Sequence, residues 1–200
     1  GFEAFKSLGY YFLVVLGGLI IHFVVVLPLL LLLAGVNPLR HYAAVMPALI
    51  TAFSTSSSMA ALPLNIDCVI TRCDVSPKIA SFVLPIGATV NMNGTALYEC
   101  VAAIFIAQVY GIELTWLQQG VVVLTSLLAA IGSAGIPMAG LVMMSIVLQS
   151  VGLPLEGIGM ILAVDRILDM FRTTLNILGD SCGAVIVARS EGEKVGGFGR

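Results

Sequence analysis

The sequence predicts an all-α membrane protein, with transmembrane helices and two opposed re-entrant helical hairpins that form an inverted repeat. Of its 200 residues, 59% are hydrophobic and 10% are charged, whereas soluble proteins carry about 25% charged residues. Stretches without Asp, Glu, Lys or Arg cover residues 7–39, 41–66, 79–98 and 114–155. Each is long enough to cross a hydrocarbon core, which takes about 20 helical residues. Polar runs interrupt the second and fourth near their middles.

Charge and cysteine content exclude other classes. The net charge of −2 gives no basic field for nucleic acid, so we expect no nucleic-acid partner. The chain begins without Met or a charged n-region, so we expect no signal peptide and treat it as the back part of a longer protein. The four cysteines lack the spacing of a zinc site, and we expect small buried hydrophobes. They are Cys68, Cys73, Cys100 and Cys182.

The first apolar stretch, residues 7–39, is long enough for one spanning helix, and the basic residues between stretches orient the rest. If residues 41–66 and 114–155 each enter and return on one side, six basic residues face the same compartment. The positive-inside rule makes that compartment the cytoplasm. The six are Arg40, Arg72, Lys78, Arg189, Lys194 and Arg200.

The interruptions read Ser54-Thr55-Ser56-Ser57-Ser58 and Gly132-Ser133-Ala134-Gly135-Ile136-Pro137, and each resembles the tip of a hairpin. Non-helical backbone is tolerated at membrane depth only where protein or a water-filled cavity satisfies its polar groups. Two tips therefore imply a polar site between them. The alternative is that the runs are Gly/Ser faces for helix packing.

Each predicted hairpin is followed by a long helix with polar residues, over 79–110 and 155–189. An inverted repeat of interrupted segments indicates a secondary transporter with its site near the midplane. The first of these helices contains Gly87-Ala88-Thr89-Val90-Asn91-Met92-Asn93-Gly94-Thr95, which we expect to be locally unwound. Exposed carbonyls with Asn and Asp oxygens suit Na⁺.

Five polar residues of the last helix share one face, since their spacings are 4, 3, 4 and 4. A charge at the centre of a spanning helix costs about 2.5–3.5 kcal/mol on insertion scales, so we expect a function for them. A guanidinium binds a carboxylate bidentately and a carboxylate accepts an ammonium, which predicts a zwitterion or anion site. Alternatively, Asp169 and Arg172 only neutralise each other. The five are Asp165, Asp169, Arg172, Asn176 and Asp180.

Two isolated polar residues have alternative interpretations. Glu99 is the one charge between Lys78 and Glu113, and desolvation favours its neutral form, so it is a candidate proton carrier. The alternative is that Arg166 neutralises it. His22 lies in an apolar helix, where we expect a packed or hydrogen-bonded histidine and not a ligand.

Four motifs in this order resemble the dicarboxylate/amino acid:cation symporters, the family of the glutamate transporters. They are the serine-rich tip, the N-M-N-G-T helix, the G-S-A-G-I-P tip and D-R-I-L-D-M-F-R-T-T-L-N-I-L-G-D. The resemblance implies part of a mobile transport domain, with earlier helices and a trimeric scaffold outside this chain. It implies transmembrane helices over 8–35, 76–110 and 154–189, hairpins over 41–75 and 115–152, and a cytoplasmic tail over 190–200.

The resemblance also implies site residues. Substrate would contact Ser56, Ser58, Thr95, Ile136, Gly140, Asp169, Arg172, Thr173 and Asn176. Co-transported sodium would be held at one site by Gly87, Asn91, Asn176 and Asp180, and at a second by backbone oxygens of Thr89, Met92, Ile131 and Ser133. Glu99 matches the glutamate of proton- and potassium-coupled members. Asn93 stands where the family's third sodium site has an aspartate, which leaves the number of sodium ions open.

The function predicted is sodium-coupled symport of glutamate or aspartate by alternating access, in a multi-pass protein of the plasma membrane. The second hairpin would be the extracellular lid. Alternatives are a proton-coupled or C4-dicarboxylate carrier of the same family, an ion channel, and a membrane-embedded hydrolase. A hydrolase needs a base beside Ser56, Ser57 or Ser58. The two histidines, His22 and His41, have no evident orienting carboxylate in the sequence, so we expect no enzyme.

Overall fold

The computed structural model describes residues 2–133 and 135–195, and within these ranges every regular element is a helix. The prediction of an all-helical chain is confirmed. In chain order the elements are α1 (Phe2–Ile21), the π-helix η1 (His22–Val26), α2 (Leu27–Leu33), α3 (Pro38–Thr55), α4 (Ser58–Cys73), α5 (Pro77–Val90), α6 (Asn93–Val109), α7 (Trp116–Ile131), α8 (Ala139–Ser150), the 3₁₀-helix η2 (Leu155–Gly157) and α9 (Ile158–Ser190).

Two long helices are apolar enough to cross a membrane. Lys6–Leu33 runs through α1, η1 and α2 with a mean hydropathy of 2.8, and Pro77–Val109 covers α5 and α6 with 1.3. Pro28 does not end the first span, because it directly follows the π-helix η1, where the regular α-helical hydrogen-bond pattern is already interrupted. These spans correspond to the first and third apolar stretches of the sequence.

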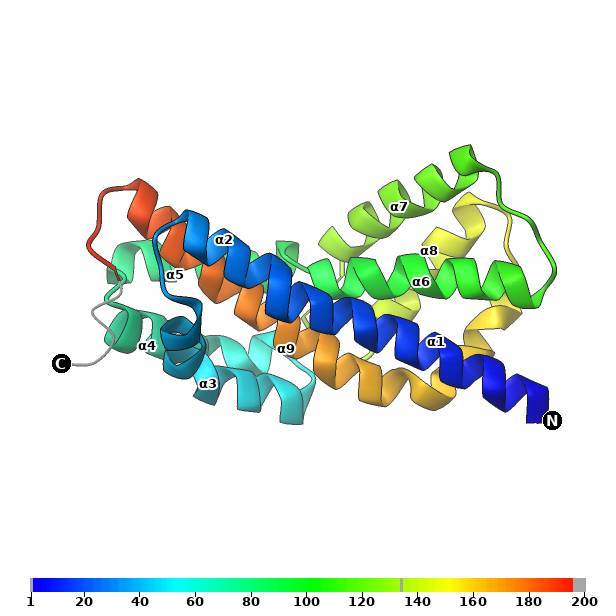
Figure 1. The fold of residues 1–200 in the computed structure, drawn as a ribbon, viewed down its shortest axis with the longest axis horizontal. Coiled ribbons are helices and arrows are strands. Elements are labelled where there is room, and N and C mark those ends of the chain that lie inside the picture. The colour runs from blue at the N-terminus through cyan, green and yellow to red at the C-terminus, as the bar shows by residue number, and fades with distance from the viewer. Residues whose placement is uncertain (1, 134, 196–200) are drawn as a thin grey trace.

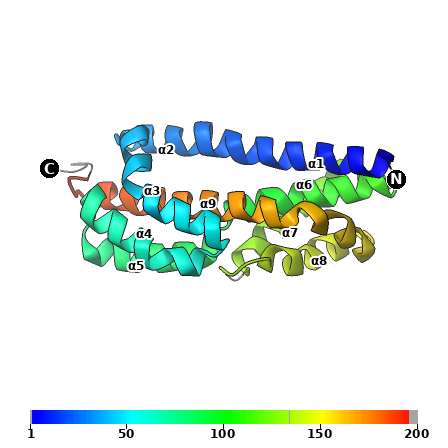
Figure 2. The ribbon, with the colours of Figure 1, turned by 90° about the horizontal axis from the view of Figure 1, so that it is seen from below.

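Helix α9 lies at the centre of the bundle. Figure 2 shows α1 and α2 along one side of it and α4, α5 and α8 on the other, while α6 packs against both α1 and α9. Helix α9 packs against α1, α3, α4, α5 and α6, so nearly all sides of its middle turns are enclosed by protein. The stripe of five polar residues is accordingly buried. A polar face that would be costly in lipid is thus turned toward other helices.

Two pairs of helices fold back on themselves. The first pair is α3 with α4, and the second is α7 with α8. Helix α3 ends because Ser56 adopts the left-handed conformation, with φ 51°. Ser57 then begins α4 by accepting a hydrogen bond from the Ala60 N–H through its hydroxyl. The break therefore lies within the predicted serine run.

The second pair is joined by a longer connection. Helix α7 begins with a capping box of Thr115 and Gln118 and ends at Ile131, and α8 begins at Ala139. The connection contains the predicted Gly132–Pro137 run, of which Ala134 lies outside the described residues. Between the pairs, α5 and α6 are separated by Asn91 and Met92 alone. The unwound segment expected over residues 87–95 is therefore real but short.

Candidate functional site

The tips of both helix pairs, the α5–α6 break and the polar face of α9 meet around one small cavity. Its volume is about 10 Å³, which is room for about one water molecule. The cavity lining contains mostly polar or small residues, namely Ser56, Ser58, Met92, Thr95, Ser133, Gly135, Ile136, Ala139, Gly140, Asp169, Thr173 and Asn176. The polar site inferred between two tips is therefore present, in a closed conformation.

Arg172 lies beside this cavity and is only 1% exposed. Its Nη1 donates to Oδ1 of Asp165 at 2.7 Å and its Nη2 to Oδ1 of Asp169 at 2.8 Å. Its guanidinium carbon lies 3.8 Å from the ring centroid of Tyr98, a cation–π contact. Asp169 and Arg172 therefore form the ion pair considered in the sequence analysis, and Asp165 adds a second carboxylate to it. One guanidinium faces two carboxylates, which leaves an excess negative charge in a dry site.

Asp169 also connects α9 to the second tip. Its Oδ2 accepts a hydrogen bond from the backbone N–H of Met138 at 3.0 Å. The two tips contact each other at Gly135, whose carbonyl accepts from the Ser57 hydroxyl at 2.9 Å and from the Met59 N–H at 3.1 Å. These three hydrogen bonds close the cavity from the side of the second pair.

Eight of the nine predicted substrate residues line the cavity, and the ninth, Arg172, reaches its edge. Arg172 Nη2 lies 3.8 Å from where a side chain on Gly140 would begin. Asn176 donates through Nδ2 to the Thr95 hydroxyl at 3.3 Å, and its Oδ1 accepts from the Gly94 N–H at 2.8 Å. The structure thus gathers residues that are up to 120 positions apart in the sequence.

The first predicted sodium site is also assembled from distant segments. Asn91 donates through Nδ2 to Oδ1 of Asp180 at 2.8 Å, and Asn176 lies one turn before Asp180 on α9. A Cβ on Gly87 would lie 2.7 Å from the same Asp180 oxygen, so only glycine fits there. Asp180 Oδ2 is buried without a hydrogen-bond partner among the described residues. A buried carboxylate oxygen without a hydrogen-bond partner is a ligand of the kind that a hard cation prefers.

The second predicted sodium site is less complete. Met92 and Ser133 both line the cavity. Thr89 and Ile131 are not among its lining residues, and the Thr89 hydroxyl donates to the Ile86 carbonyl of its own helix at 2.9 Å. Within the described residues, no three His, Cys, Asp or Glu side chains gather as a metal cluster. Any cation here would depend on carbonyl and amide oxygens.

Glu99 is fully buried, and neither carboxyl oxygen has a hydrogen-bond partner within the described part of the chain. The alternative that Arg166 neutralises it is wrong, because Arg166 is exposed on α9 and the ion pairs found in the described residues all belong to Arg172. A buried carboxyl normally has a hydrogen-bond or ion-pair partner, so a carboxyl with neither calls for a functional explanation. Glu99 therefore remains a candidate proton carrier.

Three contributors were not predicted from the sequence. The sequence places Asp165 on the polar stripe but does not predict its ion pair with Arg172. The signal was there, because a separation of seven residues is about two helical turns and puts both side chains on one face. The ring of Tyr98 and the backbone N–H of Met138 carry no sequence signal of their own. Each depends on how α6 and the second pair approach α9.

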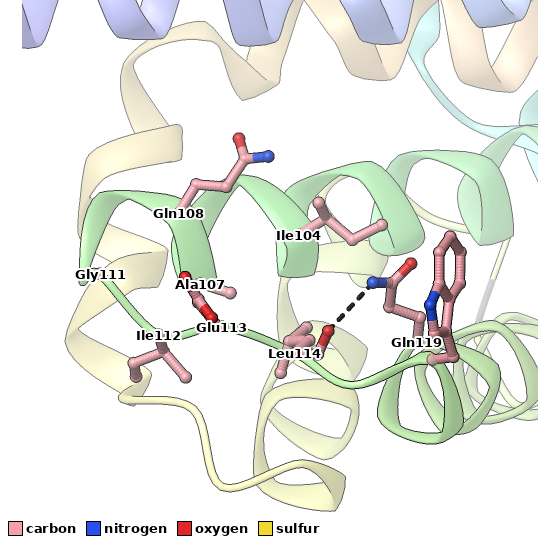
Figure 3. Close-up of a pocket in the computed structure, with 9 residues that line it drawn as sticks. Ile104, Ala107, Gln108, Gly111, Ile112, Glu113, Leu114 and Gln119 are labelled. Carbon is pink, nitrogen blue, oxygen red and sulfur yellow. Dashed lines mark hydrogen bonds between the residues drawn. The ribbon is translucent and has the colours of Figure 1, made fainter.

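A larger hollow lies elsewhere in the described structure. It has a volume of about 580 Å³ and lies between the end of α6 and the start of α7 (Figure 3). Gln119 Nε2 donates to the Leu114 carbonyl there at 3.1 Å. Glu113 is the one charged side chain in its lining, and no predicted site residue belongs to it. Its open shape and lack of convergent polar groups make it a poor candidate for the functional site.

The contacts of His41 argue against a hydrolytic site. Its Nε2 lies 2.9 Å from the Ser181 hydroxyl and its Nδ1 lies 3.7 Å from the Cys73 sulfur. All three side chains are fully buried. A serine hydrolase needs a base oriented by a third group and open to substrate, whereas here a thiol stands in the third position without access.

Comparisons with known proteins place these observations among transporters. The sequence model of the "Sodium:dicarboxylate symporter family" matches residues 1–190. The chain is 49% identical over 188 residues to excitatory amino acid transporter 3 of Mus musculus, covering 94% of this chain and 36% of that protein. It is 53% identical over 182 residues to excitatory amino acid transporter 1 of Homo sapiens, covering 90% and 34%. The chain thus spans about a third of the length of these relatives.

Proposed function

We propose, since the chain belongs to the sodium:dicarboxylate symporter family, that it forms most of the mobile transport domain of a sodium-coupled symporter of glutamate or aspartate. The family and its excitatory amino acid transporter relatives are transporters, not enzymes. The predicted membership is confirmed by the match over residues 1–190. Transport by the whole protein is inferred from the residues of this chain, which spans about a third of its relatives' length.

The observation that carries the proposal is Arg172, a buried guanidinium at the edge of a cavity where two helix breaks meet. A planar fork of donors recognises a carboxylate bidentately. Asp169, beside it, has an oxygen that accepts from a backbone N–H and in the same way accepts from an ammonium. The two groups together match a substrate that carries both a side-chain carboxylate and an amino group.

Binding would proceed by exchange of partners. The side-chain carboxylate of the substrate replaces Asp169 on Nη2 of Arg172 and also accepts from Nε, which has no partner within the described residues, while Asp165 keeps Nη1. Asp169 is then free for the substrate's amino group and releases the Met138 N–H, so the second tip must move for substrate to enter. The α-carboxylate of the substrate is held by Asn176 with the two serines of the first tip, Ser56 and Ser58.

Sodium would supply the charge balance. A guanidinium between Asp165 and Asp169 leaves one negative charge in the site, and Asp180 adds another. Uncompensated charges in a low dielectric are costly, so each carboxylate favours a bound cation. Asp180 with the oxygens of Gly87, Asn91 and Asn176 holds one sodium ion. The backbone oxygens of Thr89, Met92, Ile131 and Ser133 hold a second when the second tip closes.

Transport would follow from coupling between these sites. Cation binding favours the closed second tip around substrate, and this prevents movement of either alone. In this proposal α3–α4 and α7–α8 are re-entrant hairpins of an inverted repeat, the second being the extracellular lid. The whole protein is a multi-pass plasma-membrane homotrimer, assembled through helices outside this chain. Glu99 carries a proton or serves potassium countertransport.

The test is uptake of radiolabelled aspartate into proteoliposomes of the full-length protein, with and without an inward sodium gradient. We expect saturable uptake that requires the gradient. Uptake that does not saturate indicates a channel, and uptake driven by a proton gradient or by succinate in place of aspartate indicates the other carriers of the family. A covalent serine probe that labels Ser56, Ser57 or Ser58 would favour a hydrolase.

A further inference from the structure

Between Tyr11 and Asn37 the sequence is apolar, and His22 is the one residue there with a polar side chain. It lies at the first position of the π-helix η1, and its Nε2 lies 3.0 Å from Nδ2 of Asn93. Asn93 is the first residue of α6, directly after the α5–α6 break. The expectation that His22 is hydrogen-bonded and not a ligand agrees with this contact. A π-turn holding the residue is a feature often found at functional positions.

The orientation of the Asn93 amide is fixed by its other partner. The Gly94 N–H donates to Asn93 Oδ1 at 2.8 Å, and since a backbone N–H is a donor, the atom facing it must be the amide oxygen. The amide nitrogen of Asn93 therefore faces His22. Because that nitrogen is a donor, His22 Nε2 must accept, so its ring carries a hydrogen on Nδ1.

The same amide is in contact with the proposed sodium and substrate groups. The Gly94 N–H is shared between Asn93 Oδ1 and Asn176 Oδ1, both at 2.8 Å. A Cβ on Gly179 would lie 2.7 Å from Nδ2 of Asn91 and 3.3 Å from Nδ2 of Asn93. The two asparagines thus lie side by side against a bare turn of α9. A rotation of the Asn93 amide would disturb Gly94, Asn176 and Asn91 together.

We propose that His22 is a positioning residue of the sodium site, and that Asn93 acts as a hydrogen-bonded strut between η1 and α6 and not as a cation ligand. The strut turns the amide nitrogen, a donor that repels cations, toward His22 of η1, while the amide oxygen accepts from the Gly94 N–H. It thereby holds the α5–α6 break in the shape that brings Asn91 to Asp180. This inference rests on the proposed function, because it concerns the sodium ions of that same site.

The experiment measures the sodium dependence of aspartate uptake by the full-length protein in proteoliposomes. In His22→Leu the acceptor is lost, and we expect the half-saturating sodium concentration to rise about three- to tenfold, the effect of one net hydrogen bond, with maximal uptake unchanged. In His22→Gln the amide oxygen accepts from Asn93, and we expect sodium dependence close to the wild type. Val25→Leu, an exposed position of the same π-helix, is the matched control and should behave as wild type.

A fourth variant separates a strut from a ligand. Asn93→Asp places an oxygen opposite His22, and we expect no steeper sodium dependence than in the wild type. Steeper dependence would show that position 93 binds a cation and would overturn the inference. The inference would also be overturned if His22→Leu had the same half-saturating sodium concentration as the wild type. The same holds if this concentration rose equally in His22→Leu and His22→Gln. If wild-type uptake does not require sodium, the proposed function fails as well.

Discussion

The two helix pairs have the same design but different tips. The first tip is two residues long, and its serines are almost inaccessible, with Ser56 1% and Ser57 9% exposed. The second tip runs from Gly132 to Met138, and its apolar side chains protrude, with Ile136 57% and Met138 41% exposed. In Figure 1, α7 diverges from the bundle, whereas α3 and α4 stay alongside it.

The difference indicates which wall of the site moves. Helices α3 and α4 pack against α9, and the hydroxyl of Ser57 caps α4. Both tips contain a left-handed residue, Ser56 and Met138, but helix α8 has no side-chain cap at its start. A few hydrogen bonds, to Gly135 and from Met138, hold this tip closed. We therefore expect the second tip to open and the first to stay in place.

The largest effect is expected from removing the guanidinium that pairs with Asp165 and Asp169 at the edge of the cavity. Arg172→Cys leaves Asp165 and Asp169 without a counter-charge, and removing one partner of a buried pair costs about 3–5 kcal/mol. We expect aspartate uptake to fall at least about 100-fold and neutral amino acids to compete better, as measured by competition in proteoliposomes. Arg166→Cys, an exposed arginine of the same helix, is the control. Retained aspartate affinity in Arg172→Cys would contradict the assignment.

A smaller effect is expected from preventing the tips from meeting. In Gly135→Ala the new Cβ would lie 2.9 Å from the Ala88 carbonyl oxygen and 3.1 Å from Met59, and the backbone oxygen cannot yield. We expect the second tip to be displaced and the half-saturating substrate concentration to rise about tenfold. Gly132→Ala is the matched control, since its nearest neighbour atom is 3.6 Å away. Labelling of a cysteine introduced at Ser133, which is 4% exposed in the same tip, should increase in Gly135→Ala only; equal labelling would show that the tips do not need this contact.

Ser57→Ala tests the fixed tip. It removes the cap on the Ala60 N–H and the hydrogen bond to the Gly135 carbonyl, while the Met59 N–H still donates to that carbonyl. We expect a two- to fivefold rise in half-saturating substrate, about the effect of one hydrogen bond. Ser57→Thr should restore the wild-type value. A loss in Ser57→Ala as large as in Gly135→Ala would remove the distinction between the tips.

The smallest effect is expected away from both tips, between the start of α5 and the segment that follows α9. There the Ser76 N–H donates to Oε2 of Glu193 at 2.9 Å. Hydrogen bonds from the Ser76 side chain and backbone hold the pKa of Glu193 below its usual value. A carboxyl whose pKa is lowered by folding stabilises the protein at pH values above its unfolded pKa. This stabilisation is lost as the pH falls through the folded-state pKa. Glu193→Gln should therefore be slightly less stable at pH 7, and the difference should vanish below about pH 4. Thermal unfolding over pH measures this, and uptake at pH 7 should not change.

Several parts of the site could be predicted from the pattern of residue types in the sequence. The five polar residues of α9 follow a helical period, so their common face could be derived without a structure. The serine run and the glycine-rich run interrupt apolar stretches, and the α5–α6 break lies in the Asn-rich segment between Gly87 and Thr95. The partners of these groups could not be derived in this way. Neither the contact of Gly135 with Ser57 nor that of His22 with Asn93 follows a period, because each joins segments more than 70 residues apart.

The sequence by itself determined the class of the protein and the order of its elements, because burial in a bilayer depends on the local density of charge along the chain and helix breaks depend on local residue types. Its motifs also identified the family. Only the tertiary structure decided which polar atoms meet: that Arg172 is shared by Asp165 and Asp169, that Glu99 has no hydrogen-bond or ion-pair partner within the described residues, and that the second tip is hydrogen-bonded to Asp169. The physical reason is that a polar group buried among helices must find its partners across the packing interface, and the interface is set by all the helices together.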